Sequence, residues 1–317
     1  MDPATDLLDL SRSQRMLRTA LGPLLLARLE DPATAEVMLN PDGRVFVDRL
    51  DQGLAPTDLR IAPADAERIL RLVAHHVGAE VDAARPRLSA ELPGSGERFE
   101  GLLPPVVTGP AFSIRKPARA VFSLTDYVRD GVMSFDQAEV LADAVRERAN
   151  ILVVGATSSG KTTLVNALLA KVAETGDRVV LCEDLRELQC AADNQVALRT
   201  LDGVVGLDDL VRSALRLRPD RIIIGEVRGG EALDLIKAWG TGHPGGVGTL
   251  HAGSAIGALH RLEQLIQEAV VTVPRALIAD TIDLVAVLAG RGRQRRLIEL
   301  ARLEGLGPDG AYQLSPA

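Results

Sequence analysis

Two helical patterns and several strand patterns occupy the first part of the chain. Leucines recur at helical spacing in residues 12–30, and residues 64–77 alternate apolar and polar positions with a period near 3.6. Residues 36–39 and 44–50 are short apolar-rich runs on either side of an Asn-Pro-Asp-Gly turn sequence, which is typical of two strands joined by a tight turn. Residues 86–122 are strand-like but are broken by Pro and Gly.

The pattern divides the chain into two domains. Residues 1–120 are predicted to form a small α+β domain, and residues 121–136 are predicted to be a linker. Within that segment, Ser134 is followed three positions later by Gln137, which is the sequence of a capping box ahead of a helix. The second domain is predicted to span residues 137–317.

The second domain has a different periodicity. Residues 151–154, 179–182 and 222–224 are short, continuously apolar runs rich in β-branched residues. Helical stretches at 162–172 and 207–217 lie between them. Buried strands that alternate with helices indicate a parallel sheet with both faces covered. The fold class predicted for this domain is therefore α/β.

Composition and charge narrow the class of protein. The chain has 317 residues, a net charge of −7 and only 3% aromatic residues, which argues against general adhesion to nucleic acid and against base-stacking surfaces. Its two cysteines, Cys182 and Cys190, are too few for a disulfide framework or a zinc site. Because no apolar run approaches the ~20 residues of a membrane span and the N-terminus lacks signal-peptide features, we expect a cytoplasmic protein.

A phosphate-binding loop follows the first buried strand of the second domain. The sequence G-x4-G-K-T at 155–162 joins that strand to a helix, which is the context that a phosphate loop requires. Gly155 and Gly160 permit backbone conformations in which successive N–H groups face phosphate oxygens, while Lys161 would bridge the β- and γ-phosphates and Thr162 would ligate Mg²⁺. The expected ATP-binding residues are Gly155, Ala156, Thr157, Ser158, Ser159, Gly160, Lys161, Thr162 and Thr163.

Acidic residues follow the next two buried strands. Glu183 and Asp184 come after one strand and Glu226 after the other, so all three are expected at the carboxyl edge of the sheet, near the γ-phosphate. One acid can hold Mg²⁺ while another orients or deprotonates the attacking water; the alternative is that these acids only cap turns. Gly225 stands where many phosphate-loop ATPases carry the metal-holding Asp, which shifts the metal role to Glu226. Arg228 directly follows this acid and can pair with a carboxylate.

Three segments resemble one family. Residues 215–232, 241–252 and 183–188 resemble the Walker B signature, the histidine box and the aspartate box of the secretion ATPases of type II and type IV systems. With the phosphate loop, these motifs stand in the order and at the spacing of that family. Residues 37–44 and 96–105 narrow the resemblance to its conjugative-transfer members, and the resemblance covers essentially the whole chain.

The resemblance implies a fold and a site. The fold is a RecA-like ATPase domain preceded by a PAS-like N-terminal domain, and the cofactors are ATP and Mg²⁺. In this family Glu183 would activate water, Glu226 would act on Mg²⁺ or its water shell, and His251 would contact the γ-phosphate region. Arg98 and Arg115 would approach the terminal phosphates; the alternative for each is a solvated surface arginine.

The resemblance also implies partners. It predicts a homohexameric ring that docks on inner-membrane components of a conjugative type IV secretion system, at the cytoplasmic face of that membrane. A nucleic-acid translocase or helicase with the same RecA-like fold remains an alternative. A nucleotide-dependent scaffold that barely hydrolyses ATP is a second one, which the presence of both Glu183 and Glu226 disfavours.

Overall fold

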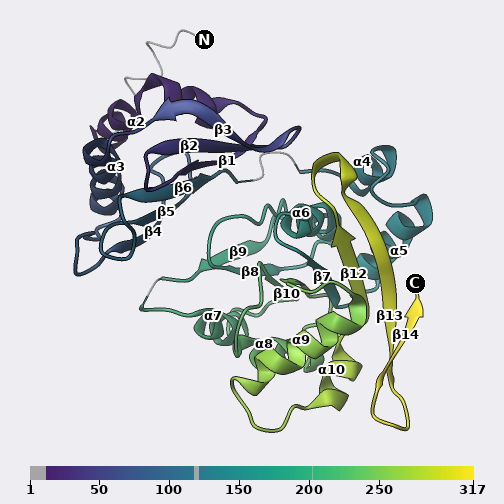
Figure 1. The fold of residues 1–317 in the computed structure, drawn as a ribbon. Helices are drawn as coiled ribbons and strands as arrows, with labels where there is room; N and C mark the ends of the chain where they lie inside the picture. The colour runs from purple at the N-terminus through teal and green to yellow at the C-terminus, as the bar shows by residue number, and fades with distance from the viewer. Residues whose placement is uncertain (1–11, 118–120, 202) are drawn as a thin grey trace. The chain divides into compact units, whose positions relative to one another are not determined.

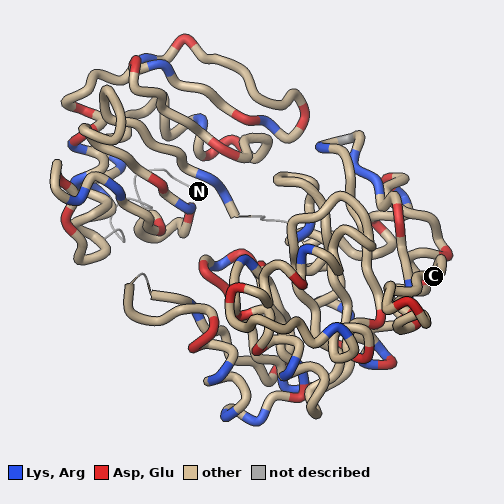
Figure 2. The backbone as a smooth tube through the Cα atoms, turned by 60° about the horizontal axis from the view of Figure 1, so that its bottom comes forward, with Lys and Arg blue, Asp and Glu red and all other residues tan. Residues whose placement is uncertain are grey.

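The chain folds into two compact units that divide between residues 119 and 120. The computed structural model describes residues 12–117, 121–201 and 203–317 (Figure 1). We call the two parts the N-terminal unit and the C-terminal unit. In both, basic and acidic residues are interspersed along the backbone (Figure 2). Among the described residues, no helix is both long enough and apolar enough to cross a membrane.

The N-terminal unit is an antiparallel sheet with two helices. The strand order is β3-β2-β1-β6-β5-β4, and apolar side chains from α2, α3 and the strands form one core. Both predicted helices are present, and α2 is kinked at Gly22 (φ 72°), which precedes Pro23. The elements are α2 (Arg12–Glu30), β1 (Thr34–Leu39), β2 (Arg44–Arg49), β3 (Gly53–Arg60), α3 (Pro63–His76), β4 (Arg87–Glu91), β5 (Arg98–Leu102) and β6 (Ala111–Arg115).

The C-terminal unit is built on an eight-stranded sheet of order β14-β13-β12-β7-β11-β10-β8-β9. The six strands from β12 to β9 are parallel, and β13 and β14 add an antiparallel hairpin at one edge (Figure 1). The strands are β7 (Ile151–Gly155), β8 (Val179–Glu183), β9 (Gln195–Arg199), β10 (Arg221–Ile224), β11 (Val247–Leu250), β12 (Leu284–Ala289), β13 (Arg296–Leu306) and β14 (Tyr312–Pro316).

Helices cover both faces of this sheet, which confirms the α/β prediction. In β7, Leu152 and Val154 pack into a core shared with α7 to α10, whereas Ile151 and Val153 pack into a core shared with α4 to α6. The helices are α4 (Leu124–Arg129), α5 (Phe135–Arg146), α6 (Lys161–Val172), α7 (Leu207–Ala214), α8 (Glu231–Gly240), α9 (Ala255–Gln267) and α10 (Arg275–Thr281), with short 3₁₀ turns η1 (Ala173–Thr175) and η2 (Gly292–Gln294).

The segment predicted as a linker differs from that prediction. Ser123 caps helix α4 in a capping box with Asp126, and the side chains of Leu124 and Tyr127 are buried in the core of the C-terminal unit. Helix formation and burial therefore tie residues 124 onward to the C-terminal unit. The capping box predicted at Ser134 is present ahead of α5.

A buried ion pair lies at the N-terminal ends of the parallel strands β8 and β10. Arg221, at the start of β10, is 1% exposed and donates to Asp177 at 2.6 Å, and Arg148 pairs with the same carboxylate. Burial alone would raise the pKa of Asp177, but the hydrogen bond from Arg221 and the nearby charges outweigh it and lower that pKa. Asp177 is therefore ionised in the folded protein at neutral pH.

Candidate active site

The loop between β7 and α6 has the backbone of a phosphate cradle. Ser158 and Gly160 are left-handed, with φ of 64° and 94°, and Gly155 has φ of 156°. A Cβ atom on Gly155 would lie 2.4 Å from the carbonyl oxygen of Leu288, so no side chain fits there. Because α6 begins at Lys161, the loop ends at a helix N-terminus, whose free N–H groups and dipole favour anions.

Lys161 connects the loop to the histidine box. Its side chain is buried, and Nζ donates to the carbonyl oxygens of Gly155 and Ala156 at 3.1 Å each. The same Nζ lies 3.3 Å from Nδ1 of His251, which follows β11, the strand beside β7. The fold therefore brings the phosphate loop and the histidine box into contact.

Glu226 continues this network. One carboxylate oxygen lies 2.6 Å from Nε2 of His251, and the other accepts from Arg228 at 2.5 Å. Arg228 also donates to Asp184 at 2.9 Å, so a continuous set of contacts runs from Lys161 to the aspartate box. Burial would raise the pKa of Glu226, but Arg228, His251 and Lys161 outweigh it and hold the pKa below its ordinary value.

Glu183 has a different environment. It is 3% exposed, and one of its oxygens accepts the backbone N–H groups of Glu187 and Leu188 at 2.8 and 2.9 Å. Burial raises the pKa of Glu183, and these two hydrogen bonds only partly oppose it. The turn-capping contacts weighed as an alternative for this residue are thus present. A Cβ atom at Gly225 would lie 3.1 Å from Cβ of Glu183, so the glycine leaves room for this side chain.

Two residues of the site were not singled out from the sequence. Glu187 accepts a hydrogen bond from the Thr162 hydroxyl at 3.2 Å, and its backbone carbonyl accepts from Asn166 at 3.1 Å. Asn166 also accepts from the backbone of Gln189 at 2.9 Å and is fully buried. A single polar residue about one turn after the phosphate loop, within the otherwise apolar stretch 164–170, is the signal that identifies Asn166. It fixes the aspartate box against α6.

Arg98 and Arg115 lie in the N-terminal unit. Arg98 opens β5 and Arg115 closes β6, and the two are direct cross-strand partners in the antiparallel register. Opposed residues in such a pair have Cβ atoms about 5 Å apart on the same face, where like charges destabilise each other. Glu36 of β1 is opposite Arg115 and Glu91 of β4 is opposite Arg98, so each arginine also has an acidic cross-strand neighbour.

The donors suit Mg²⁺ bound mainly through a nucleotide. The Thr162 hydroxyl and the carboxylates of Glu226 and Glu187 are hard oxygen ligands of the kind that Mg²⁺ prefers. Across the described ranges, no group of three or more His, Cys, Asp or Glu side chains is arranged to hold a metal ion. Mg²⁺ in nucleotide sites usually takes one or two protein ligands and completes its shell with phosphates and water.

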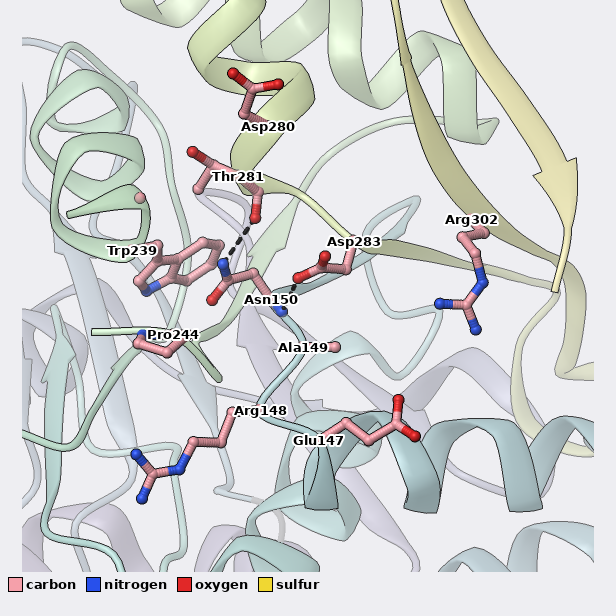
Figure 3. Close-up of a pocket in the computed structure, with 11 residues that line it drawn as sticks. Glu147, Arg148, Ala149, Asn150, Trp239, Pro244, Asp280, Thr281, Asp283 and Arg302 are labelled. Carbon is pink, nitrogen blue, oxygen red and sulfur yellow. Dashed lines mark hydrogen bonds between the residues drawn. The ribbon is translucent and has the colours of Figure 1, made fainter. Parts of the chain in front are cut away.

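A cavity of about 350 Å³ lies elsewhere in the C-terminal unit (Figure 3). It is at the N-terminal end of β7, where the Asn150 side chain donates to Thr281 and accepts from Gly245 and Gly246. Its wall includes Asp283, whose carboxylate accepts from the Asn150 backbone. Ligands of open α/β sheets bind at the carboxyl ends of the strands, so this cavity is not the nucleotide site.

Comparison with known proteins places the chain in a family. The family of type II/IV secretion system proteins matches residues 26–295. A conjugal transfer protein TrbB from Rhizobium radiobacter is 48% identical over 93% of this chain and 91% of its own length. The type IV secretion system protein PtlH from Bordetella pertussis is 35% identical over 86% of this chain and 91% of that protein.

A solved structure agrees in fold. The structure of the pilus retraction motor PilT with bound ADP matches with a TM-score of 0.59 and 20% identity, over 92% of this chain and 80% of PilT. This chain is a TrbB-like ATPase that belongs to the type II/IV secretion system family.

Proposed function

We propose that the chain is the Mg²⁺-dependent ATP-hydrolysing motor of a conjugative type IV secretion system, serving pilus assembly or DNA transfer. The observation that carries the proposal is the set of contacts at the carboxyl edge of the sheet that joins Lys161, His251, Glu226, Arg228 and Asp184. Four motifs that are separate in sequence thereby form one site. Such a site has the parts that phosphoryl transfer to water requires.

The phosphate loop performs the binding step. Its backbone N–H groups and the N-terminus of α6 hold the phosphates, and Lys161 moves from the loop carbonyls to the β- and γ-phosphate oxygens. Thr162 and Glu226 would hold Mg²⁺ and its water shell, and the bound ion would neutralise phosphate charge. The lowered pKa of Glu226 keeps its carboxylate ionised for this role.

Glu183 is the proposed base. Its pKa is raised by burial, which brings it closer to the operating pH and increases its tendency to accept a proton from water. Water attacks the γ-phosphorus directly, the bond to the leaving ADP oxygen breaks, and the proton passes to the carboxylate of Glu183. His251, in contact with both Lys161 and Glu226, responds to the γ-phosphate region.

Arg98 and Arg115 are proposed to neutralise charge on the terminal phosphates. Their direct cross-strand pairing supports this role, because it places two residues of the type best suited to phosphate recognition at the same level of adjacent strands. We further propose that the motor is a homohexamer that docks on inner-membrane components of the secretion apparatus, at the cytoplasmic face. Direct binding to nucleic acid is not part of this proposal.

Substitution of Lys161 tests the function. Lys161→Ala should abolish ATP hydrolysis and most triphosphate affinity, because it removes the ammonium group that contacts the β- and γ-phosphates. Lys171→Ala is the matched control, since this half-exposed lysine at the other end of the same helix pairs with Glu174. Phosphate release and binding of a fluorescent ATP analogue are measured on the full chain. Near-normal turnover in folded Lys161→Ala would refute the assignment, and binding without turnover in the unsubstituted protein would favour a scaffold.

A further inference from the structure

One further arginine lies against the phosphate loop. Arg295 stands between η2 and β13, and its guanidinium group covers the Cα of Gly160. A Cβ atom at Gly160 would lie 2.5 Å from Nε, 2.6 Å from Cζ and 3.0 Å from Nη1 of Arg295. Gly160 is required for its left-handed backbone, and a side chain there would also displace this guanidinium group.

The Arg295 side chain has unused hydrogen-bonding capacity. Its Nε is buried and has no hydrogen-bond partner within the described chain, and the same holds for the buried hydroxyl of Tyr127. Burial raises the pKa of Tyr127 and the positive charge of Arg295 opposes that shift, so the two side chains are close enough to interact electrostatically. The buried, unpaired Nε–H of a guanidinium group that lies against the phosphate cradle is a donor available to an anion bound there.

The sheet order tells which side of the loop Arg295 occupies. Strand β7 lies between β11 and β12. His251 follows β11 and Glu226 follows β10, which is farther out on the same side, whereas Arg295 follows β12 on the other side. Arg295 therefore reaches Gly160 from the flank away from the groups assigned to the γ-phosphate and the attacking water.

We propose that Arg295 is a nucleotide-binding residue that contacts the α- and β-phosphates from within its own chain. The inference rests on the proposed function, because it assumes a nucleoside di- or triphosphate in the phosphate loop. Since ADP and ATP share these two phosphates, Arg295 stabilises both equally and contributes to affinity and not to the chemical step. Its loss should raise KM and leave kcat nearly unchanged.

The first measurement is equilibrium binding to the full chain. Arg295→Gln should weaken fluorescent ADP and a non-hydrolysable ATP analogue by the same factor, about tenfold to a hundredfold, as expected for a lost charge-assisted hydrogen bond. Arg295→Lys should bind with intermediate affinity, because it keeps the charge but loses the planar fork. Arg291→Gln is the matched control: this exposed residue of the same turn carries the same charge, and it should bind normally.

Competition by inorganic pyrophosphate identifies the contact. Pyrophosphate should compete less well in Arg295→Gln by a similar factor; unchanged competition would overturn the inference, because the arginine would then contact base or sugar. Equal loss in Arg291→Gln, or a fall in kcat without a change in KM, would overturn it as well. If circular dichroism shows that Arg295→Gln is unfolded, the nucleotide affinity of Arg295→Lys becomes the test. Normal affinity in Arg295→Lys would then refute the phosphate contact. Normal binding in Arg295→Gln beside lost binding in Lys161→Ala rejects only this inference, whereas normal binding in both rejects the proposed function.

Discussion

Replacing Glu183 separates the two roles that its carboxylate has in the structure. One oxygen accepts two backbone N–H groups of the aspartate box, which is a structural contact. The carboxylate is also the proposed base, which is a chemical role. Gln keeps an oxygen that can accept both N–H groups but cannot take up a proton, whereas Ala removes both functions. The pair Glu183→Gln and Glu183→Ala therefore distinguishes the roles.

The magnitudes follow from burial and contacts. Glu183→Ala leaves two buried N–H groups without their acceptor, at about 1–3 kcal/mol each, so a loss of about 2–6 kcal/mol in the free energy of unfolding is expected. Glu183→Gln should change the free energy of unfolding by less than about 1 kcal/mol, since its weaker hydrogen bonds are offset by the removal of a buried charge. Its hydrolysis rate should fall by about 10²- to 10⁴-fold, the usual contribution of a general base.

Three assays on each variant give the answer. Urea unfolding reports stability, fluorescent ATP binding reports the phosphate loop, and phosphate release reports turnover. The expected pattern for Glu183→Gln is a folded protein with near-normal ATP binding and very low turnover. A Glu183→Gln protein that hydrolyses ATP at the normal rate would refute the reasoning, because the carboxylate would then be a turn cap and the base would be Asp184 or Glu226.

The remaining predictions concern stability. Asp177→Ala leaves the buried Arg221 without its carboxylate, so urea unfolding should show a loss of about 3–5 kcal/mol, and an unchanged midpoint would contradict a role for this ion pair. The pH dependence should have opposite signs for the two acids. Because the pKa of Glu183 is raised, this residue stabilises the folded protein below pH 4.5, and the stabilisation is lost as pH rises through the raised pKa. Because the pKa of Glu226 is lowered, this residue stabilises the folded protein above pH 4.5, and the stabilisation is lost as pH falls through the lowered pKa. The free energy of unfolding is measured against pH for the unsubstituted protein, Glu183→Gln and Glu226→Gln. The difference between the unsubstituted protein and each variant should change with pH in opposite directions for the two acids, and a change in the same direction would refute the assignment.

Much of the fold was predictable because periodicity reports burial directly. Strands β7, β8 and β10 are buried on both faces, so each reads as a continuous apolar run. The hairpin of β13 and β14 was not predicted, because its half-exposed strands mix charged and apolar residues. The linker prediction at 121–136 missed α4, whose six residues are too few to show a helical period.

The site was predictable where chemistry is concentrated in short motifs. The phosphate loop and the acids after β8 and β10 follow from sequence, since the carboxyl ends of parallel strands meet at one edge. Arg295 could not be found this way, because it lies in a turn rich in Gly and Arg that reads as a solvated loop. Only the pairing of β12 with β7 brings that turn to Gly160.

Gly225 stands where many phosphate-loop ATPases carry the metal-holding Asp, and this difference is connected with the environment of Glu183. Strand β10 pairs with β8 so that Ile224 is opposite Cys182, which places Gly225 beside Glu183. Any side chain at 225 would press on Glu183, and a second carboxylate there would add a like charge to a buried acid whose ionised form is already disfavoured. With glycine at this position, the negative charge of the Walker B segment lies instead on Glu226, where Arg228 and His251 stabilise it. The two acids are thereby driven to opposite pKa shifts, which is the separation expected of a proton acceptor and a metal-binding carboxylate that share one site.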